Sequence, residues 1–139
     1  MKTSSISPIQ RVLIRRSFRK VARHPDLVAE LLYNRLFEIA PACKMLFACD
    51  MQQQGRKFIQ FLAISVVSLD TPEILIRAIQ ELGQRHSRYA ITMADYQQVG
   101  EALRYALEQT LSEDWTPELN QAWTAFCDFI AQTAVMPIN

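Results

Sequence analysis

Apolar residues recur along this chain at the three- to four-residue spacing of helices, and no segment alternates apolar and polar residues over the length of a strand. Only three glycines interrupt the pattern. The spacing therefore predicts an all-α fold. The expected helices run from about Pro8 to Ala22, Pro25 to Ile39, Met51 to Leu69, Thr71 to Tyr89, Ala94 to Leu111 and Pro117 to Val135.

Pairs of a hydroxyl residue and a proline mark several of the expected helix starts. The hydroxyl can accept hydrogen bonds from free backbone N–H groups, and proline suits the first helical position. Two further prolines, Pro25 and Pro41, interrupt the apolar pattern and predict breaks on either side of the second helix. The hydroxyl-proline pairs are Ser7-Pro8, Thr71-Pro72 and Thr116-Pro117.

Two expectations about packing follow from the apolar positions. The helix expected from Met51 to Leu69 is apolar on most of its circumference, so we expect it to lie at the centre of the molecule. The first helix has a single apolar stripe, which we expect to face the core. Its members are Ile9, Val12, Leu13, Phe18 and Val21.

The length and charge of the chain narrow the classes of partner. A chain of 139 residues is the size of a single domain with one core, so we take residues 1–139 as one domain. Lys and Arg number 15 and Asp and Glu 14, a balance that favours neither nucleic acid nor an anionic membrane as partner. The sequence shows no signal-peptide pattern and no apolar run of roughly 20 residues, so we expect a cytoplasmic protein.

Two groups of residues have roles that the sequence leaves open. The basic residues of the first helix could form a membrane-surface or partner-binding face, or simply a solvated helix face. The three cysteines, Cys43, Cys49 and Cys127, have neither the number nor the spacing of a disulfide framework or a zinc site, which favours reduced thiols. The basic residues are Arg11, Arg15, Arg16, Arg19, Lys20 and Arg23.

One of the chain's two histidines, His86, lies near the end of an expected helix, in the string Leu82-Gly83-Gln84-Arg85-His86-Ser87-Arg88-Tyr89. A single histidine is most often a satisfied core or surface residue. This string, however, resembles the proximal-histidine segment of the globin family, in which the histidine binds the haem iron. The resemblance implies haem b as the cofactor and His86 as the ligand of its iron.

The likeness to globins extends over about residues 8–135. The segment 32–37, Pro41 and Leu46-Phe47 resemble the family's second helix, its proline corner and the phenylalanine that stacks on the porphyrin. Segment 50–58 resembles the start of the distal helix, and the resemblance implies that Gln54 takes the distal position, 32 residues before His86, which is the family's usual interval. Segments 96–103 and 122–123 resemble the last two helices. The resemblance is to bacterial single-domain globins, the haem domain of flavohaemoglobins and neuroglobin, and it implies a globin fold of about six to eight helices around a haem pocket.

The resemblance also implies a set of pocket residues. A ferrous haem needs a neutral imidazole, an apolar slot and one or two polar groups directed at the bound gas. Tyr33 and Gln54 can donate hydrogen bonds to dioxygen, although each could instead be a solvated side chain. Lys57 either pairs with a haem propionate or is solvated. The expected lining residues, each of which could equally be ordinary core, are Phe47, Phe58, Phe61, Leu82, Tyr89, Val99 and Leu103.

Three positions depart from the family's pattern. Ala90 follows Tyr89 where glycine is common, and this difference affects the turn after His86 but not the ligand. Cys127 stands where related globins often carry a tyrosine near the proximal side, which puts a proximal hydrogen-bond network like that of flavohaemoglobins in doubt. Phe58 replaces a smaller leucine or valine, so its ring is expected to restrict ligand entry.

These residues support three hypotheses about function. The first is reversible binding of O2, NO or CO for storage, transport or sensing. The second is a nitric oxide dioxygenase; because the chain has no Gly-rich dinucleotide fingerprint, this enzyme would need a separate reductase. The third is a haemless globin-like interaction domain or a binder of another tetrapyrrole. The sequence is compatible with a monomer or a homodimer.

Overall fold

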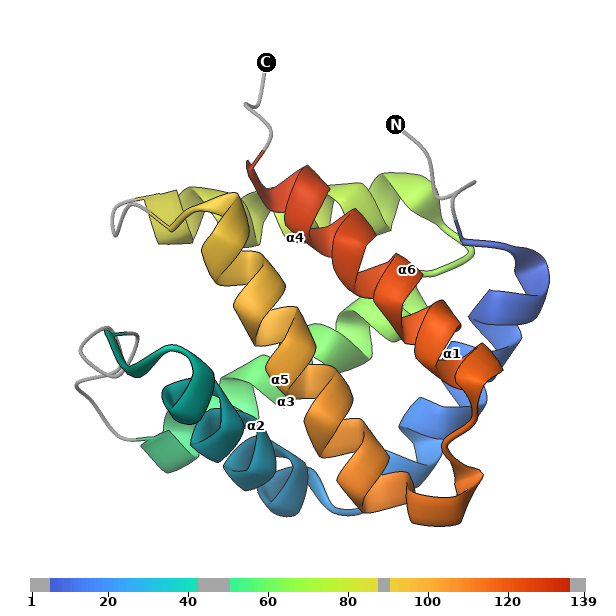
Figure 1. The fold of residues 1–139 in the computed structure, drawn as a ribbon. Helices are drawn as coiled ribbons and strands as arrows, with labels where there is room; N and C mark the ends of the chain where they lie inside the picture. Colours follow the sequence, from blue (N-terminus) through green and yellow to red (C-terminus); the bar gives the residue numbers. More distant parts are fainter. Residues whose placement is uncertain (1–5, 43–50, 88–90, 136–139) are drawn as a thin grey trace.

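The computed structural model describes residues 6–42, 51–87 and 91–135, without the side chains of residues 51 and 85–87. Within these ranges the regular elements are all helices, which confirms the predicted all-α class (Figure 1). The bounds of α2 and α6 agree with the prediction, and the other described ends lie within two residues of it. The elements are α1 (Pro8–Val21), α2 (Pro25–Ile39), α3 (Met51–Val67), α4 (Pro72–Ser87), α5 (Met93–Leu111), the short 3-10 helix η3 (Ser112–Asp114) and α6 (Pro117–Val135).

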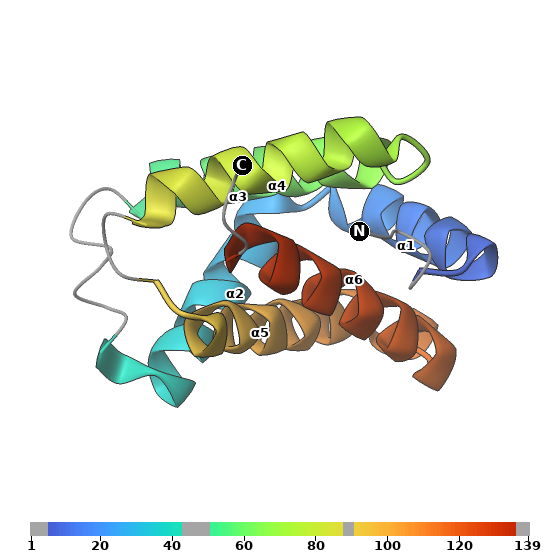
Figure 2. The same ribbon diagram turned by 90° about the horizontal axis from the view of Figure 1, so that it is seen from above.

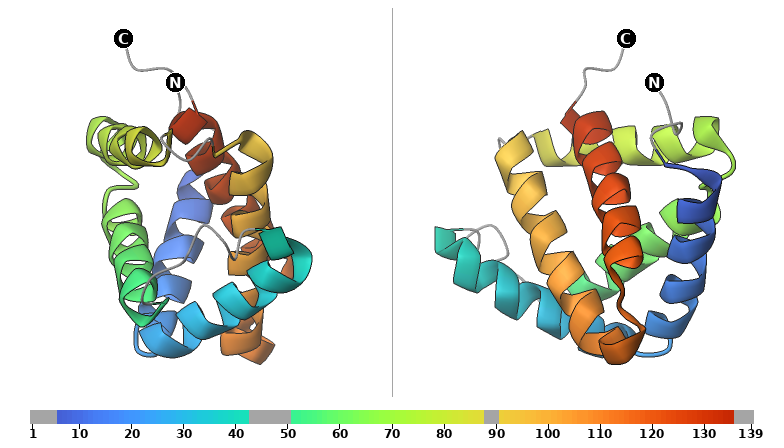
Figure 3. Two further views of the ribbon diagram at one scale, coloured as in Figure 1. Left: turned by 90° about the vertical axis from the view of Figure 1, so that its left-hand side faces the viewer. Right: turned by 45° about the vertical axis from the view of Figure 1, so that its right-hand side comes forward.

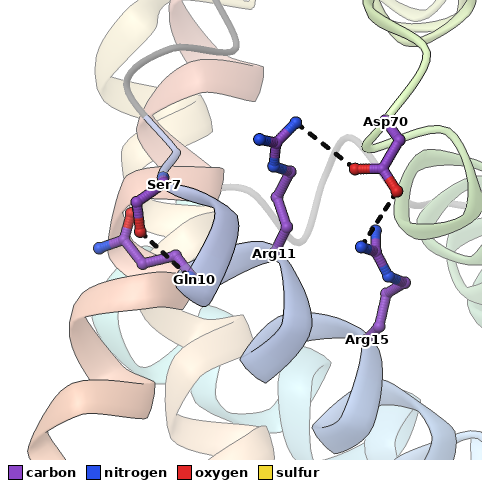
Figure 4. Close-up of polar contacts among 5 residues, drawn as sticks. All are labelled: Ser7, Gln10, Arg11, Arg15 and Asp70. Carbon is purple, nitrogen blue, oxygen red and sulfur yellow. Dashed lines mark hydrogen bonds and ion pairs between the residues drawn. The ribbon is translucent and has the colours of Figure 1, made fainter.

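The predicted hydroxyl caps are present at two of these helices. The Ser7 hydroxyl accepts from the backbone N–H of Gln10 at 3.1 Å, and the Gln10 side chain accepts from the Ser7 N–H at 3.0 Å (Figure 4). At the start of α6, the Thr116 hydroxyl accepts from the Leu119 N–H at 3.1 Å. These bonds satisfy N–H groups that the first turn of a helix leaves without a helical partner.

A third cap was not predicted and moves the start of α5 one residue earlier. The Thr92 hydroxyl accepts from the Asp95 N–H at 3.2 Å, and the Asp95 carboxylate accepts from the Thr92 N–H at 2.8 Å. The Thr-x-x-Asp spacing of these two residues was the available signal for this capping box.

The helices form two sides of the molecule. Figure 2 shows α3 and α4 together on one side and α5 and α6 on the other, and Figure 3 shows the same division from two further directions. α3 and α4 meet at the turn around Asp70 and separate toward their other ends (Figure 1). α2 packs mainly on α5, while α6 contacts α4, α5 and α1. The space between the two sides is therefore bounded by several helices.

The core contains a buried polar link between the first and last helices. Trp123 and Phe126 of α6 are fully buried, and the Trp123 indole N–H donates to the Ser17 hydroxyl of α1 at 2.9 Å. That hydroxyl donates in turn to the backbone carbonyl of Leu13 at 2.8 Å. Each buried polar group in this chain of bonds thus has a partner, which avoids the cost of leaving it unsatisfied.

The expectation that the helix from Met51 to Leu69 lies at the centre is wrong. α3 forms an outer wall, with Leu62 and Val66 buried but Ile64 and Val67 54% and 78% exposed. The most deeply buried aromatic residues belong to α6 instead. A helix can be apolar around most of its circumference without being central, because part of that surface faces a cavity or solvent.

The apolar stripe predicted for the first helix is also partly wrong. Ile9 and Val12 are exposed, whereas Ile14 is fully buried beside Phe18 and Val21. The core face of α1 includes Ser17, a polar residue that is tolerated there because its hydroxyl is bonded on both sides. The prediction was therefore wrong for Ile9 and Val12, whereas Leu13, Phe18 and Val21 do pack in or against the core.

Part of the basic run in α1 makes ion pairs within the chain. Arg11 and Arg15 both reach Asp70 at the turn between α3 and α4, with N···O distances of 3.4 and 3.1 Å (Figure 4). Lys20 pairs with Asp114 of η3 at 3.1 Å. These contacts are at the surface, so each contributes at most about 1 kcal/mol. None of the helices in the described part of the chain is both long and apolar enough to span a membrane.

Gly83 permits the closest approach between α4 and α6. A Cβ atom at this position would overlap the backbone carbonyl of Ala134. Because backbone cannot rotate aside as a flexible side chain can, any larger residue would force the two helices apart. This glycine therefore fixes how α4 sits against the rest of the molecule.

We predict that Gly83→Ala lowers the free energy of unfolding by about 1–3 kcal/mol, despite the better helix propensity of alanine, because α4 must move away from α6. Gly100→Ala is the matched control. Its Cβ would meet the Cys127 side chain at 3.2 Å rather than backbone, so we expect a change within about 1 kcal/mol. Urea denaturation followed by circular dichroism measures both, and equal stabilities for the two variants would contradict the close contact at Gly83.

Candidate functional site

A cavity of about 570 Å³ lies between the two sides of the molecule. This volume is within the range of small-molecule and cofactor sites, roughly 300 to 1,000 Å³. Its wall is mainly apolar, with a few polar side chains. The lining residues come from α2 (Leu32, Tyr33, Leu36), α3 (Gln54, Lys57, Phe58, Gln60, Phe61, Leu62, Ile64), α4 (Ala78, Glu81, Leu82), Ile91, α5 (Asp95, Tyr96, Val99, Gly100, Leu103) and α6 (Cys127, Ile130, Ala131).

The cavity brings together most of the residues that the sequence singled out for a binding site. Phe47 and Tyr89, also expected to line it, lie outside the described residues, as do Ala90, Cys43 and Cys49. The predicted residues found in its wall are Tyr33, Gln54, Lys57, Phe58, Phe61, Leu82, Val99 and Leu103.

One polar corner of the cavity is built by the crossing of α2 and α3. Gly55 lies against α2, and a Cβ atom on it would be 2.7 Å from the Cβ of Ala29 and 3.8 Å from the Tyr33 ring. Tyr33 is one turn beyond Ala29, and Gln54 directly precedes Gly55. The close crossing therefore places a phenol and an amide on adjacent walls of one cavity.

The Tyr33 side chain is held in place by its neighbours. It is only 7% exposed, and its ring stacks on Phe37 with 6.1 Å between the ring centroids. A buried tyrosine with a packed ring presents its hydroxyl in a restricted set of directions. Gln54, on the adjacent wall formed by α3, is partly exposed to solvent.

The rest of the α3 wall follows helical spacing. Phe58 and Phe61 are half-buried and continue the face that begins at Gln54, three to four residues apart. Lys57 is exposed at the rim, so its ammonium group remains in contact with water. The wall is polar at its start and aromatic further along.

Helical spacing predicts that position 86 shares the cavity face of α4. Ala78 and Leu82 line the cavity, and residues four apart share a helix face. His86 is one turn beyond Leu82 and is the last residue but one of α4, although its side chain lies outside the described part. The backbone thus puts His86 at the end of α4 that is farthest from the turn at Asp70.

The sequence did not identify Tyr96 and Ile130 as lining residues. Tyr96 continues the stripe of Val99 and Leu103 on α5, and Ile130 follows Cys127 by one turn on α6. The spacing of each pair was visible in the sequence. The sequence does not show which face of these two mainly buried helices meets the cavity and which meets the core.

Two ionisable side chains in the wall are kept neutral by their surroundings. Burial raises the pKa of the Tyr96 phenol, and the neighbouring Asp95 carboxylate raises it further. Burial also raises the pKa of the Cys127 thiol to about 11, with Asp128 adding to the increase and Arg104 opposing it. Near neutral pH Tyr96 is therefore a hydrogen-bond donor, and Cys127 is a neutral thiol rather than a thiolate.

Comparison with known sequences supplies the class of protein that this fold and site define. A sequence model of the globin family matches residues 30–134, and the chain belongs to the globin family. It is 34% identical over 133 residues to a flavohemoprotein of Xylella fastidiosa strain Temecula1, a match that covers 93% of this chain and 33% of that protein. A flavohemoprotein of Bordetella pertussis is 27% identical over 124 residues, which cover 86% of this chain and 31% of that one. The chain spans about a third of the length of these relatives.

Solved structures agree on the fold. An engineered carbene transferase, a candidate nitric oxide dioxygenase from Rhodothermus marinus, is 31% identical and superposes with a TM-score of 0.81 over 91% of this chain and 89% of that one. A hexacoordinated heme protein from an anhydrobiotic tardigrade has a TM-score of 0.84 over 93% and 92% of the two chains, at 15% identity. The second likeness shows the globin fold alone.

Proposed function

We propose that this globin binds haem b in the 570 Å³ cavity through His86 and reversibly takes up O2 or another diatomic gas, such as NO or CO. The observation that supports the proposal is that Tyr33 and Gln54 line one apolar cavity together with Ala78 and Leu82 of α4. Helical spacing from these two residues is expected to bring His86 to the same cavity. Relatives named flavohemoprotein over 93% of the chain support the choice of cofactor.

The residues present fit a haem. The cavity is lined mainly by apolar side chains, which suit a flat, largely apolar macrocycle and exclude water from its faces. Bound haem supplies an iron at which the gas is held. The protein contributes a neutral imidazole from His86, since the other histidine, His24, lies at the exposed start of α2.

The polar corner would hold the gas. The Tyr33 hydroxyl and the Gln54 amide N–H are both donors, and a gas that acquires partial negative charge gains from each such bond. Tyr33 is buried, where a hydrogen bond is electrostatically stronger than at the surface. We therefore expect Tyr33 to contribute more than Gln54.

Two other wall residues have separate roles in this proposal. Lys57 is exposed at the rim, where its ammonium group can meet a haem propionate without losing its own hydration. Cys127 is a neutral thiol near neutral pH, so it is a filler of the wall and not a competing ligand. The chain has no third histidine that could bind from the Gln54 side, so a bound iron would keep that side available for the gas.

A second function, nitric oxide dioxygenase, is favoured by the 31% identity to the Rhodothermus marinus protein along nearly its whole length. Conversion of NO and O2 to nitrate consumes one electron. We propose that a reductase supplies this electron. Nitrate formation in aerobic NO with an added reductase would support this activity, and gas binding without nitrate would support storage, transport or sensing.

We predict that His86→Ala abolishes or strongly weakens haem retention, because the cavity then has no imidazole for the iron. His24→Ala is the matched control, since His24 is exposed and makes no side-chain cap at α2. Haem content and the ferrous and CO-bound spectra measure the effect. A His86→Ala variant with the spectra of the native protein would exclude His86 as the ligand.

We predict that Tyr33→Phe and Gln54→Leu each speed O2 release, because each removes a hydrogen bond worth about 1–3 kcal/mol, or roughly 5- to 150-fold in rate. Stopped-flow O2 dissociation measures both. Gln97→Leu is the matched control for Gln54→Leu, because Gln97 is exposed and does not line the cavity. Off-rates within about twofold of the native value in both Tyr33→Phe and Gln54→Leu would refute the donor pair.

A further inference from the structure

The cavity extends well beyond the corner that holds Tyr33 and Gln54. Its lining on α3 runs from Gln54 to Ile64, a span of about 15 Å along the helix. On α4 the lining runs from Leu82 back to Ala78, toward the turn at Asp70. Because the two helices are antiparallel and joined at that turn, Ile64 and Ala78 belong to the far end of the cavity (Figure 1).

The exposed rim of the cavity changes character along this length. Lys57, Gln60 and Glu81 are lining residues that are also exposed, so the cavity reaches solvent through a polar mouth. Ile64 also lines the cavity and is 54% exposed, with the half-buried Ala78 on the facing helix. The far end of the lining is therefore aliphatic, and Ile64 there contacts both the cavity and solvent.

We propose that small apolar gases enter and leave the cavity between Ile64 and Ala78, separately from the polar mouth at Lys57. This proposal rests on the proposed gas-binding function. O2 and CO lose little on leaving water for an aliphatic passage, and apolar cavities of protein interiors take up xenon and other apolar molecules.

The polarity of the mouth at Lys57 favours the aliphatic entrance. The polar side chains at the mouth hold water, which a gas must displace. From Ile64 inward, the wall continues through Phe61 and Leu82, which hold no water.

An entrance has a kinetic signature that a binding residue does not have. Narrowing the only fast passage slows entry and exit by the same factor, because the bound and free states are unchanged and the dissociation constant is the ratio of the two rates. A substitution that disturbs the binding corner changes that ratio. The comparison of both rates thus separates a passage from a perturbed site.

The experiment compares Ile64→Trp with Ile74→Trp in the haem-loaded chain. Ile74 is also 54% exposed, and it is on the neighbouring helix but does not line the cavity, so it is a matched control. Flash photolysis of the CO complex gives association rates, and ligand replacement gives dissociation rates. We expect Ile64→Trp to slow both by about threefold or more with unchanged affinity, and Ile74→Trp to change neither.

A second variant and a second readout keep the test decisive. If Ile64→Trp fails to fold, Ile64→Ala should speed both rates, because it widens the passage.

Crystals under xenon pressure should show a xenon atom among Phe61, Ile64 and Ala78 in the native protein and none in Ile64→Trp. Unchanged CO rates in the Ile64 variants, an altered affinity, or xenon absent from this end would overturn the entrance. A native chain that takes up no haem would instead contradict the proposed function itself, before any rate is measured.

Discussion

The arrangement of the site depends on the close crossing of α2 and α3 at Gly55. With no side chain at this position, α3 approaches until its backbone faces Ala29, only 2.7 Å from where a Cβ would lie. Tyr33 follows Ala29 by one turn and Gln54 precedes Gly55, so the same contact sets the spacing of both polar groups. A larger residue at Gly55 would move α3 outward and separate the phenol from the amide. The polar corner is thus a consequence of backbone packing rather than of a bond between its two members.

The opposite wall is fixed in the same way. Gly83 lets α4 lie directly against Ala134 of α6, and the turn that joins α3 to α4 is tied to α1 through Asp70. Since surface ion pairs contribute little, the glycine contact is the stronger of these constraints. α3 and α4 are joined at the turn around Asp70 and diverge away from it (Figure 1). Residues of both helices line the cavity. Its polar mouth and its aliphatic far end follow from this divergence.

The fold could be predicted from the sequence because local signals agreed with the tertiary structure. Helical spacing and hydroxyl caps located the helices within two residues, yet spacing alone could not distinguish solvent, core and cavity as the destination of an apolar face. For this reason the sequence predicts a central α3 and core positions for Ile9 and Val12. In the structure α3 is an outer wall, and Ile14 is the buried residue. For the same reason the sequence did not indicate that Tyr96 lines the cavity. His86 and Gln54 were identified as candidate site residues by resemblance to the globin family. Periodicity could not identify them, because a single histidine or glutamine has no pattern of its own.

The central claim is that the cavity holds a haem with His86 on one side and an open position on the Gln54 side. The most direct measurement is the absorption spectrum of the chain, purified with haem b, in its ferrous, ligand-free form near neutral pH. A neutral amide is a poor ligand, and Lys57 is exposed at the rim of the cavity, so we predict a five-coordinate, high-spin spectrum with one broad visible band that CO converts to a low-spin complex. Two sharp visible bands before CO is added would show an internal ligand on the side that we describe as open, and a chain without a haem spectrum would contradict the account as a whole.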